Sequence, residues 1–177
     1  MILNPGSEPI IDVGLLLASS ISIELNGVFN FMDEPNSGTH TFSLRNNTIC
    51  QNNISLDGCE TECLFQPLGK ASFTVHNVVY GIGFHWERKE NMTFTGAIIL
   101  KECDGKIQVI NRVSLEDYLK SVIASEMSST ASMALLKAHA VMSRSWLIAQ
   151  LQTSGKKTKP KQTSSSERIR WYDREDH

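Results

Sequence analysis

Apolar and polar residues alternate along much of the first two thirds of the chain, and this pattern predicts β-strands. In ISIEL, residues 21–25, every second residue is apolar, and Asn26-Gly27 then offers a turn, so we expect a hairpin within residues 10–31. A second hairpin is predicted in TFTGAIILKECDGKIQVINRV, where Asp104-Gly105 separates two β-rich segments. Residues 71–84 also have strand composition.

Residues 33–70 break this pattern because they are polar and rich in turn-forming residues. We expect an excursion with at most short strands. It contains Cys50, Cys59 and Cys63, and the fourth cysteine is Cys103. CETEC is a single C-x3-C without a second knuckle, so no metal site is predicted; a disulfide among the three clustered cysteines and free thiols both stay open.

A helical period follows the second hairpin. Ser114 precedes Leu115-Glu116-Asp117 in an S-x-x-D arrangement that predicts a helix N-terminus, and apolar residues then recur at helical spacing until Ser125. A second helix is predicted at about 132–151, after several serines and a threonine that could cap it. Because this helix is apolar on most sides, we expect it to be central and buried.

The composition indicates the general class of protein but does not assign a function. The chain has 177 residues, 41% of them hydrophobic, which indicates a globular protein, and its net charge of −2 gives no general attraction for nucleic acid. No apolar run reaches the roughly 20 residues that cross a bilayer, and the N-terminus has no signal-peptide pattern. TSGKKTKPKQTSSSER, which begins at residue 153, has the composition of a linker.

Glu126 is the first candidate for chemistry, because it lies at the predicted junction of the two helices among small and apolar residues. A carboxyl group walled by apolar side chains favours its neutral form, as a general acid requires. The structural alternative is a carboxylate that caps the second helix or interacts with its dipole. The residues alone do not decide between them.

The other candidate functional residues also have simple structural interpretations. Lys137 and Arg144 are seven residues apart on one helix side and could bind anionic groups, or they could be ordinary surface cations. His139 and Ser143 are spaced i, i+4, but without an orienting acid a helical hydrogen bond or simple packing is the better interpretation. Trp86 in FHWERKE could stack on a sugar, or be a half-buried aromatic residue.

Residues 109–146, taken together, resemble the stage II sporulation protein D family, also called the SpoIID/LytB domain. Five separate matches carry this resemblance, and their spacing makes it specific: Asn111-Arg112-Val113, Leu115-Glu116-Asp117-Tyr118-Leu119, Ser125-Glu126-Met127, Leu136-Lys137-Ala138, and Ala140-Val141 followed by Ser143-Arg144. The resemblance implies an α+β domain over residues 1–152, with antiparallel β-hairpins before a two-helix unit that carries Glu126.

The resemblance also implies a function. The sporulation enzymes of the family are lytic transglycosylases that cleave peptidoglycan glycan strands without a cofactor, and Glu126 matches their catalytic acid/base. Lys137, Arg144 and Trp86 would contact the glycan. The LytB branch implies the alternative, a non-catalytic wall-binding or amidase-enhancing module that works with other cell-wall hydrolases. Either function implies a location outside the cytoplasmic membrane.

The chain departs from the family pattern in three places. His139 stands where glutamine is common, and Trp146 where tyrosine is usual. The ending DREDH resembles the start of an H…C…C zinc-binding stretch, with His177 at a ligand position and the cysteines absent; one histidine cannot hold a structural zinc. We therefore expect residues 153–177 to be a linker and the start of a missing C-terminal part.

Overall fold

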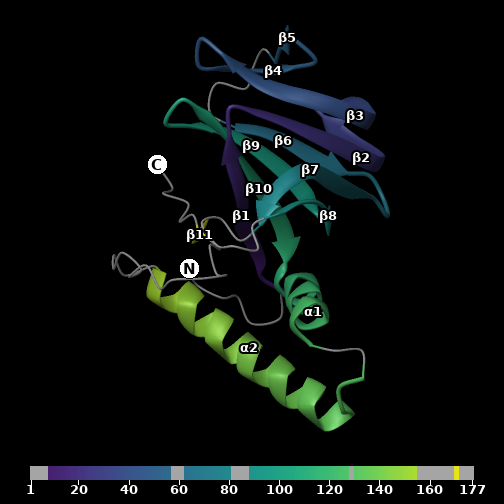
Figure 1. The fold of residues 1–177 in the computed structure, drawn as a ribbon, viewed down its shortest axis with the longest axis vertical. Helices are drawn as coiled ribbons and strands as arrows, with labels where there is room; N and C mark the ends of the chain where they lie inside the picture. The colour runs from purple at the N-terminus through teal and green to yellow at the C-terminus, as the bar shows by residue number, and fades with distance from the viewer. Residues whose placement is uncertain (1–7, 57–61, 81–87, 128–129, 155–169, 172–177) are drawn as a thin grey trace.

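The computed structural model describes residues 8–56, 62–80, 88–127, 130–154 and 170–171. Their fold is α+β, a mostly antiparallel β-structure with two helices after its last long strand, as the sequence predicts (Figure 1). The strands are β1 (Ile10–Ala18), β2 (Ser20–Phe31), β3 (Glu34–Arg45), β4 (Thr48–Gln51), β5 (Ile54–Ser55), β6 (Glu62–Pro67), β7 (Ser72–Tyr80), β8 (Arg88–Thr95), β9 (Ala97–Cys103), β10 (Lys106–Ser114) and β11 (Arg170–Trp171). The helices are α1 (Leu115–Glu126) and α2 (Met133–Ser154).

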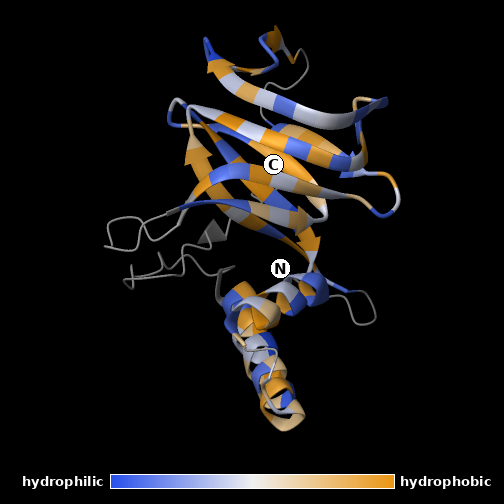
Figure 2. Cartoon of the chain, turned by 45° about the vertical axis from the view of Figure 1, so that its right-hand side comes forward, coloured by the Kyte–Doolittle hydropathy of each residue, from blue (hydrophilic) through white to orange (hydrophobic). Residues whose placement is uncertain are grey.

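The strands pair in the order β11-β1-β10-β9-β6-β2-β3-β4-β5, and β7 and β8 branch from β2. This order folds the sheet around a large core, because strands from both ends of it contribute buried side chains to one cluster. Phe65 of β6 contacts Phe31 of β2 and Phe42 of β3, with ring centroids 4.5 Å and 5.6 Å away. Figure 2 shows hydrophobic and hydrophilic positions interleaved along these strands.

Four tight hairpins explain the turn-forming residues of the sequence. Both central residues have positive φ in each of them, which is the type I′ geometry that matches the twist of the flanking strands. The predicted hairpin at Asp104-Gly105 is confirmed, with φ of 52° and 72° and Lys106 paired with Cys103. The other three turns are Met32-Asp33, Asn46-Asn47 and Asn52-Asn53.

The hairpin expected within residues 10–31 is wrong. β2 continues through Asn26-Gly27 up to Phe31, and its register against β3 shifts between Leu25 and Phe29, so Gly27 with φ +123° belongs to a bulge. A glycine with positive φ suits a bulge as well as a turn. β1 pairs with β10 instead of β2.

The polar excursion at 33–70 is also corrected. Its first part is β3, a twelve-residue strand paired with β2 along most of its length, and β4, β5 and β6 follow. Most side chains of β3 are exposed, and only Phe42 in it is buried. A strand with one solvated face lacks the apolar alternation on which the sequence prediction rested.

A second, smaller core joins the sheet to the helices. Ile11 and Val13 of β1 and Val113 of β10 pack with Leu115 and Leu119 of α1 and Leu147 of α2. The first half of the apolar stripe predicted for the first helix, Leu115 and Leu119, therefore faces the sheet, whereas Val122 and Ile123 are only partly buried. This core holds both helices against the β1 and β10 side of the molecule.

The expectation that the second helix is central and buried is wrong. Within the described part of α2, Leu147 is the single buried hydrophobic residue. Met133, Val141 and Met142 are more than 60% exposed, and Trp146 is 46% exposed. Figure 1 shows α2 lying beyond the end of the sheet instead of between its layers. An all-round apolar composition predicts burial only where other elements surround the helix.

Candidate functional site

Glu126 is the last residue of α1. The helix begins as predicted, because the Ser114 side chain accepts a hydrogen bond of 3.2 Å from the Asp117 backbone N–H. It ends because Met127 is extended, with φ −104° and ψ 140°, while its N–H still donates to the Ile123 carbonyl. These two ends place the Glu126 side chain where the chain leaves α1.

His139 of α2 contacts this carboxylate. Its Nε2 lies 3.0 Å from Glu126 Oε2, and the His139 side chain is only 10% exposed, whereas that of Glu126 is 50% exposed. The contact joins the last residue of α1 to the second turn of α2. A largely buried imidazole therefore lies next to one oxygen of a half-exposed carboxyl group.

Two sequence interpretations of Glu126 change with this geometry. The expected apolar enclosure is not found among the described residues, since half of the side chain is exposed. The capping alternative does not hold either, because Ser132 accepts the hydrogen bond from the Leu135 N–H at the start of α2. His139 contacts Glu126 through its Nε2, and among the described residues its Nδ1 has no partner, so it is not paired with Ser143.

Arg144 lies further along α2 and binds Glu116 of α1 with two hydrogen bonds, Nε to Oε1 at 2.8 Å and Nη2 to Oε2. The bonds to Arg144 lower the pKa of Glu116, and those to Glu116 raise the pKa of Arg144. Lys137, one of the two predicted substrate-binding cations of α2, is exposed. The guanidinium of Arg144, the other one, already has an anionic partner within the protein.

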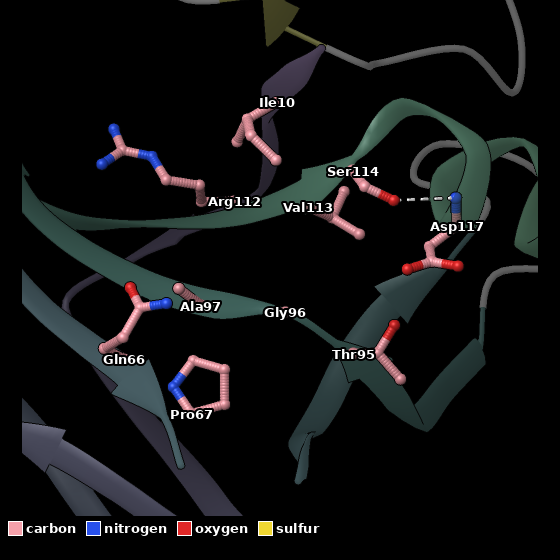
Figure 3. A pocket seen from close by; sticks show the side chains of 10 residues that line it. All are labelled: Ile10, Gln66, Pro67, Thr95, Gly96, Ala97, Arg112, Val113, Ser114 and Asp117. Atoms are coloured by element: carbon pink, nitrogen blue, oxygen red, sulfur yellow. Dashed lines mark hydrogen bonds between the residues drawn. The ribbon is translucent and has the colours of Figure 1, made fainter. Parts of the chain in front are cut away.

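A hollow that the sequence did not predict lies at the opposite end of α1 (Figure 3). It has a volume of about 320 Å³, and Asp117, Thr95 and Gly96 also line an adjoining hollow of about 530 Å³. Lys120 and Ser114 lower the pKa of Asp117 through hydrogen bonds. Asp117 and Glu126 are nine positions apart, which is about 13 Å along a helix, so this hollow and the Glu126 carboxylate are separate features.

The Asn111-Arg112-Val113 element has a structural role. Arg112 donates two hydrogen bonds of 2.7 Å to Asp12, its cross-strand partner on β1, and these bonds raise the pKa of Arg112. Figure 3 shows the guanidinium directed away from Asp117. Arg112 thus ties β10 to β1 directly before the strand enters α1.

Several predicted features lie outside the described residues. These are Trp86, Cys59, His177 and residues 155–169 of the predicted linker, whose first two residues belong to α2. Of the other cysteines, Cys63 is disulfide-bonded, whereas Cys50 and Cys103 are free. In the described ranges, no group of three His, Cys, Asp or Glu side chains is arranged to hold a metal ion.

Comparison with known families supports the resemblance. The model of the SpoIID family, described as stage II sporulation protein, matches residues 103–177. The match spans the end of β9, all of β10 and both helices, and it agrees with the family resemblance that the sequence motifs indicate. The family indicates a sporulation-related function at the cell wall.

Two other comparisons give no match. Neither a curated protein nor a solved structure matches the chain significantly. In the portion of the chain that the structure describes, no helix combines the length and apolar character needed to span a membrane.

Proposed function

We propose that this protein cleaves peptidoglycan glycan strands as a lytic transglycosylase, with Glu126 as the acid and base. The observation that carries the proposal is the SpoIID match over α1 and α2, the two helices whose junction presents Glu126. A half-exposed carboxyl group at the end of a helix is accessible to a polymer that cannot enter a closed cavity. Location outside the cytoplasmic membrane belongs to the same proposal.

The reaction needs one carboxyl group. Protonated Glu126 would donate its proton to the glycosidic oxygen that links N-acetylmuramic acid to N-acetylglucosamine, and the bond from that oxygen to the muramic C1 would break. The Glu126 carboxylate would then accept the proton of the muramic C6 hydroxyl while O6 bonds to C1. The products are a 1,6-anhydromuramic end and a free N-acetylglucosamine hydroxyl, no water is consumed, and Glu126 regains its proton.

A second carboxylate is not required, in contrast to ordinary glycosidases, which need a nucleophile or a base for water. This suits the charges on α1, because Glu116 lies about 15 Å along the helix from Glu126 and is bonded to Arg144. Lys137 is exposed on α2 and would contact anionic groups of the wall polymer. Arg144 would do so with donors that Glu116 leaves free, and Trp86 stays a proposed sugar contact.

The test is the release of anhydromuropeptides from purified peptidoglycan, measured by mass spectrometry. Glu126→Gln keeps the size of the side chain and removes the transferable proton, so we expect at least a hundredfold loss of product. Glu34→Gln is the matched control, because Glu34 is an exposed carboxylate at the start of β3, and it should release as much product as the wild type. Equal release by wild type and Glu126→Gln would contradict the proposal.

The half-exposed position of Glu126 also favours a second candidate. A non-catalytic wall-binding or amidase-enhancing module needs no apolar enclosure around this carboxyl group, and half of the Glu126 side chain is exposed. Such a module would sediment with peptidoglycan in a pull-down and release no anhydromuropeptides. Stimulation of an added cell-wall amidase by both the wild type and Glu126→Gln would establish this alternative.

A further inference from the structure

We propose that His139 is a positioning residue for Glu126: its Nε2–H anchors Oε2, so that Oε1 is the oxygen that exchanges the proton with the glycan. The inference rests on the proposed function, because it assigns the two oxygens of the proposed acid/base different tasks. It goes beyond that function in naming a second residue, from the other helix, that the reaction needs.

The geometry of the pair supports a donor role for His139. Nε2 and Oε2 are 3.0 Å apart, and His139 is nine-tenths buried, so its ring orientation is fixed by packing. Nδ1 is fully buried and has no hydrogen-bond partner within the described structure. A proton on Nδ1 would be a buried donor without an acceptor, which is costly. The neutral ring therefore keeps its proton on Nε2, where Glu126 accepts it.

The two oxygens of Glu126 consequently differ. Oε2 lies 3.0 Å from Nε2 of the largely buried imidazole, and the side chain as a whole is half-exposed. A carboxyl group held by one oxygen presents the other in a fixed direction, and fixed geometry is worth a large factor in rate. Without the anchor, the side chain of a residue at a helix end would rotate freely.

No other charged group of the two helices competes for this contact. Glu116 and Arg144 bond each other, and Asp117 bonds Lys120 at the far end of α1. On α2 itself, Lys137 and Arg144 are about 160° and 140° around the helix from His139, so both project from other sides.

Kinetics of His139→Gln and His139→Asn test the anchor. Glutamine can place its amide nitrogen near the imidazole Nε2, whereas the shorter asparagine cannot reach Glu126. We expect His139→Asn to lower kcat by about tenfold or more with little change in KM, and His139→Gln to restore most of it. Equal kcat for both variants would overturn the inference.

A measurement without turnover separates this inference from the proposed function. In ¹⁵N NMR spectra of the wild-type chain at neutral pH, the His139 ring should carry its proton on Nε2 with slow solvent exchange, and Glu126→Ala should make that exchange at least tenfold faster. A proton on Nδ1, or unchanged exchange in Glu126→Ala, would refute the anchor even in an active enzyme. If the His139 ring proton exchanges slowly but the chain releases no anhydromuropeptides, the proposed activity is refuted while the contact between His139 and Glu126 is supported.

Discussion

Among single residues, Glu116 and Arg144 make a strong polar contact between the helices. Two hydrogen bonds join a carboxylate and a guanidinium that are each about 40% exposed. Such a pair is geometrically well matched, but solvent reduces its contribution to about 0.5–1 kcal/mol. It fixes the relative rotation of α1 and α2, and thereby which side of α2 meets Glu126.

This pair predicts a specific pH dependence of stability. Because the bonds to Arg144 lower the pKa of Glu116 below its usual 4.5, the folded state holds that proton less tightly than the unfolded state. The stabilisation is therefore complete above about pH 5 and is lost as the pH falls through the lower, folded-state pKa. Urea unfolding of the wild type and Glu116→Gln should differ by about 0.5–1 kcal/mol at pH 6, and the difference should shrink towards pH 3.

Glu34→Gln provides the comparison, since no bond to its exposed side chain is described. Its free energy of unfolding should follow that of the wild type across this range. If Glu116→Gln lowers the free energy of unfolding by the same amount down to pH 3, the loss does not come from the ionised Glu116 and Arg144 pair.

Among the elements, β10 packs closely against the short connection between β8 and β9, which consists of Gly96. Gly96 has φ +99°, and a Cβ there would lie 2.5 Å from the Arg112 carbonyl oxygen and 3.2 Å from Val113 Cβ. Backbone atoms cannot move aside as a side-chain end can. Only glycine fits, and β10 needs this close contact just before it enters α1.

Gly96→Ala should therefore destabilise the protein by about 3 kcal/mol or more, because it combines strained backbone with overlap. Gly38→Ala is the matched control: φ is +82°, but nothing lies within 4 Å of the added Cβ, so only backbone strain of about 1 kcal/mol is expected. Chemical denaturation of both variants measures the two effects. Similar losses of stability in the two variants would mean that the close contact with β10 does not restrict the residue at position 96.

In the whole molecule, α2 depends on few buried contacts with the rest of the fold. Leu147 is 1% exposed and belongs to the core shared by β1, β10 and α1, whereas Val141 is 62% exposed. Leu147→Ala should lower the free energy of unfolding by about 2–4 kcal/mol, and Val141→Ala by less than about 0.5 kcal/mol.

Hydrogen exchange adds a regional measurement. In Leu147→Ala, amides of α2 should exchange faster than those of β9 and β10, because the helix loses its main buried side chain while the sheet keeps its own core. Equal acceleration in the sheet would show that the helix and the sheet unfold as one unit. Since His139 lies on α2, the same variant should also weaken the contact with Glu126.

The sequence by itself determined the features that local chemistry specifies. The Asp104-Gly105 turn, the Ser114 cap and the apolar positions Leu115 and Leu119 of α1 each depend on residues close together in the chain, and the structure contains all of them. The family is also readable from the sequence, because its motifs occupy one continuous region.

The tertiary structure alone decided the rest. Gly27 lies in a bulge because β2 continues to pair with β3 beyond it. Residues 34–45 form a strand because β2 and β4 pair with them on either side, which the polar composition of these residues does not predict. The exposure of α2 and the contact of His139 with Glu126 likewise depend on which distant elements meet. Pairing and burial are properties of neighbours in space, and a one-dimensional pattern records only neighbours along the chain.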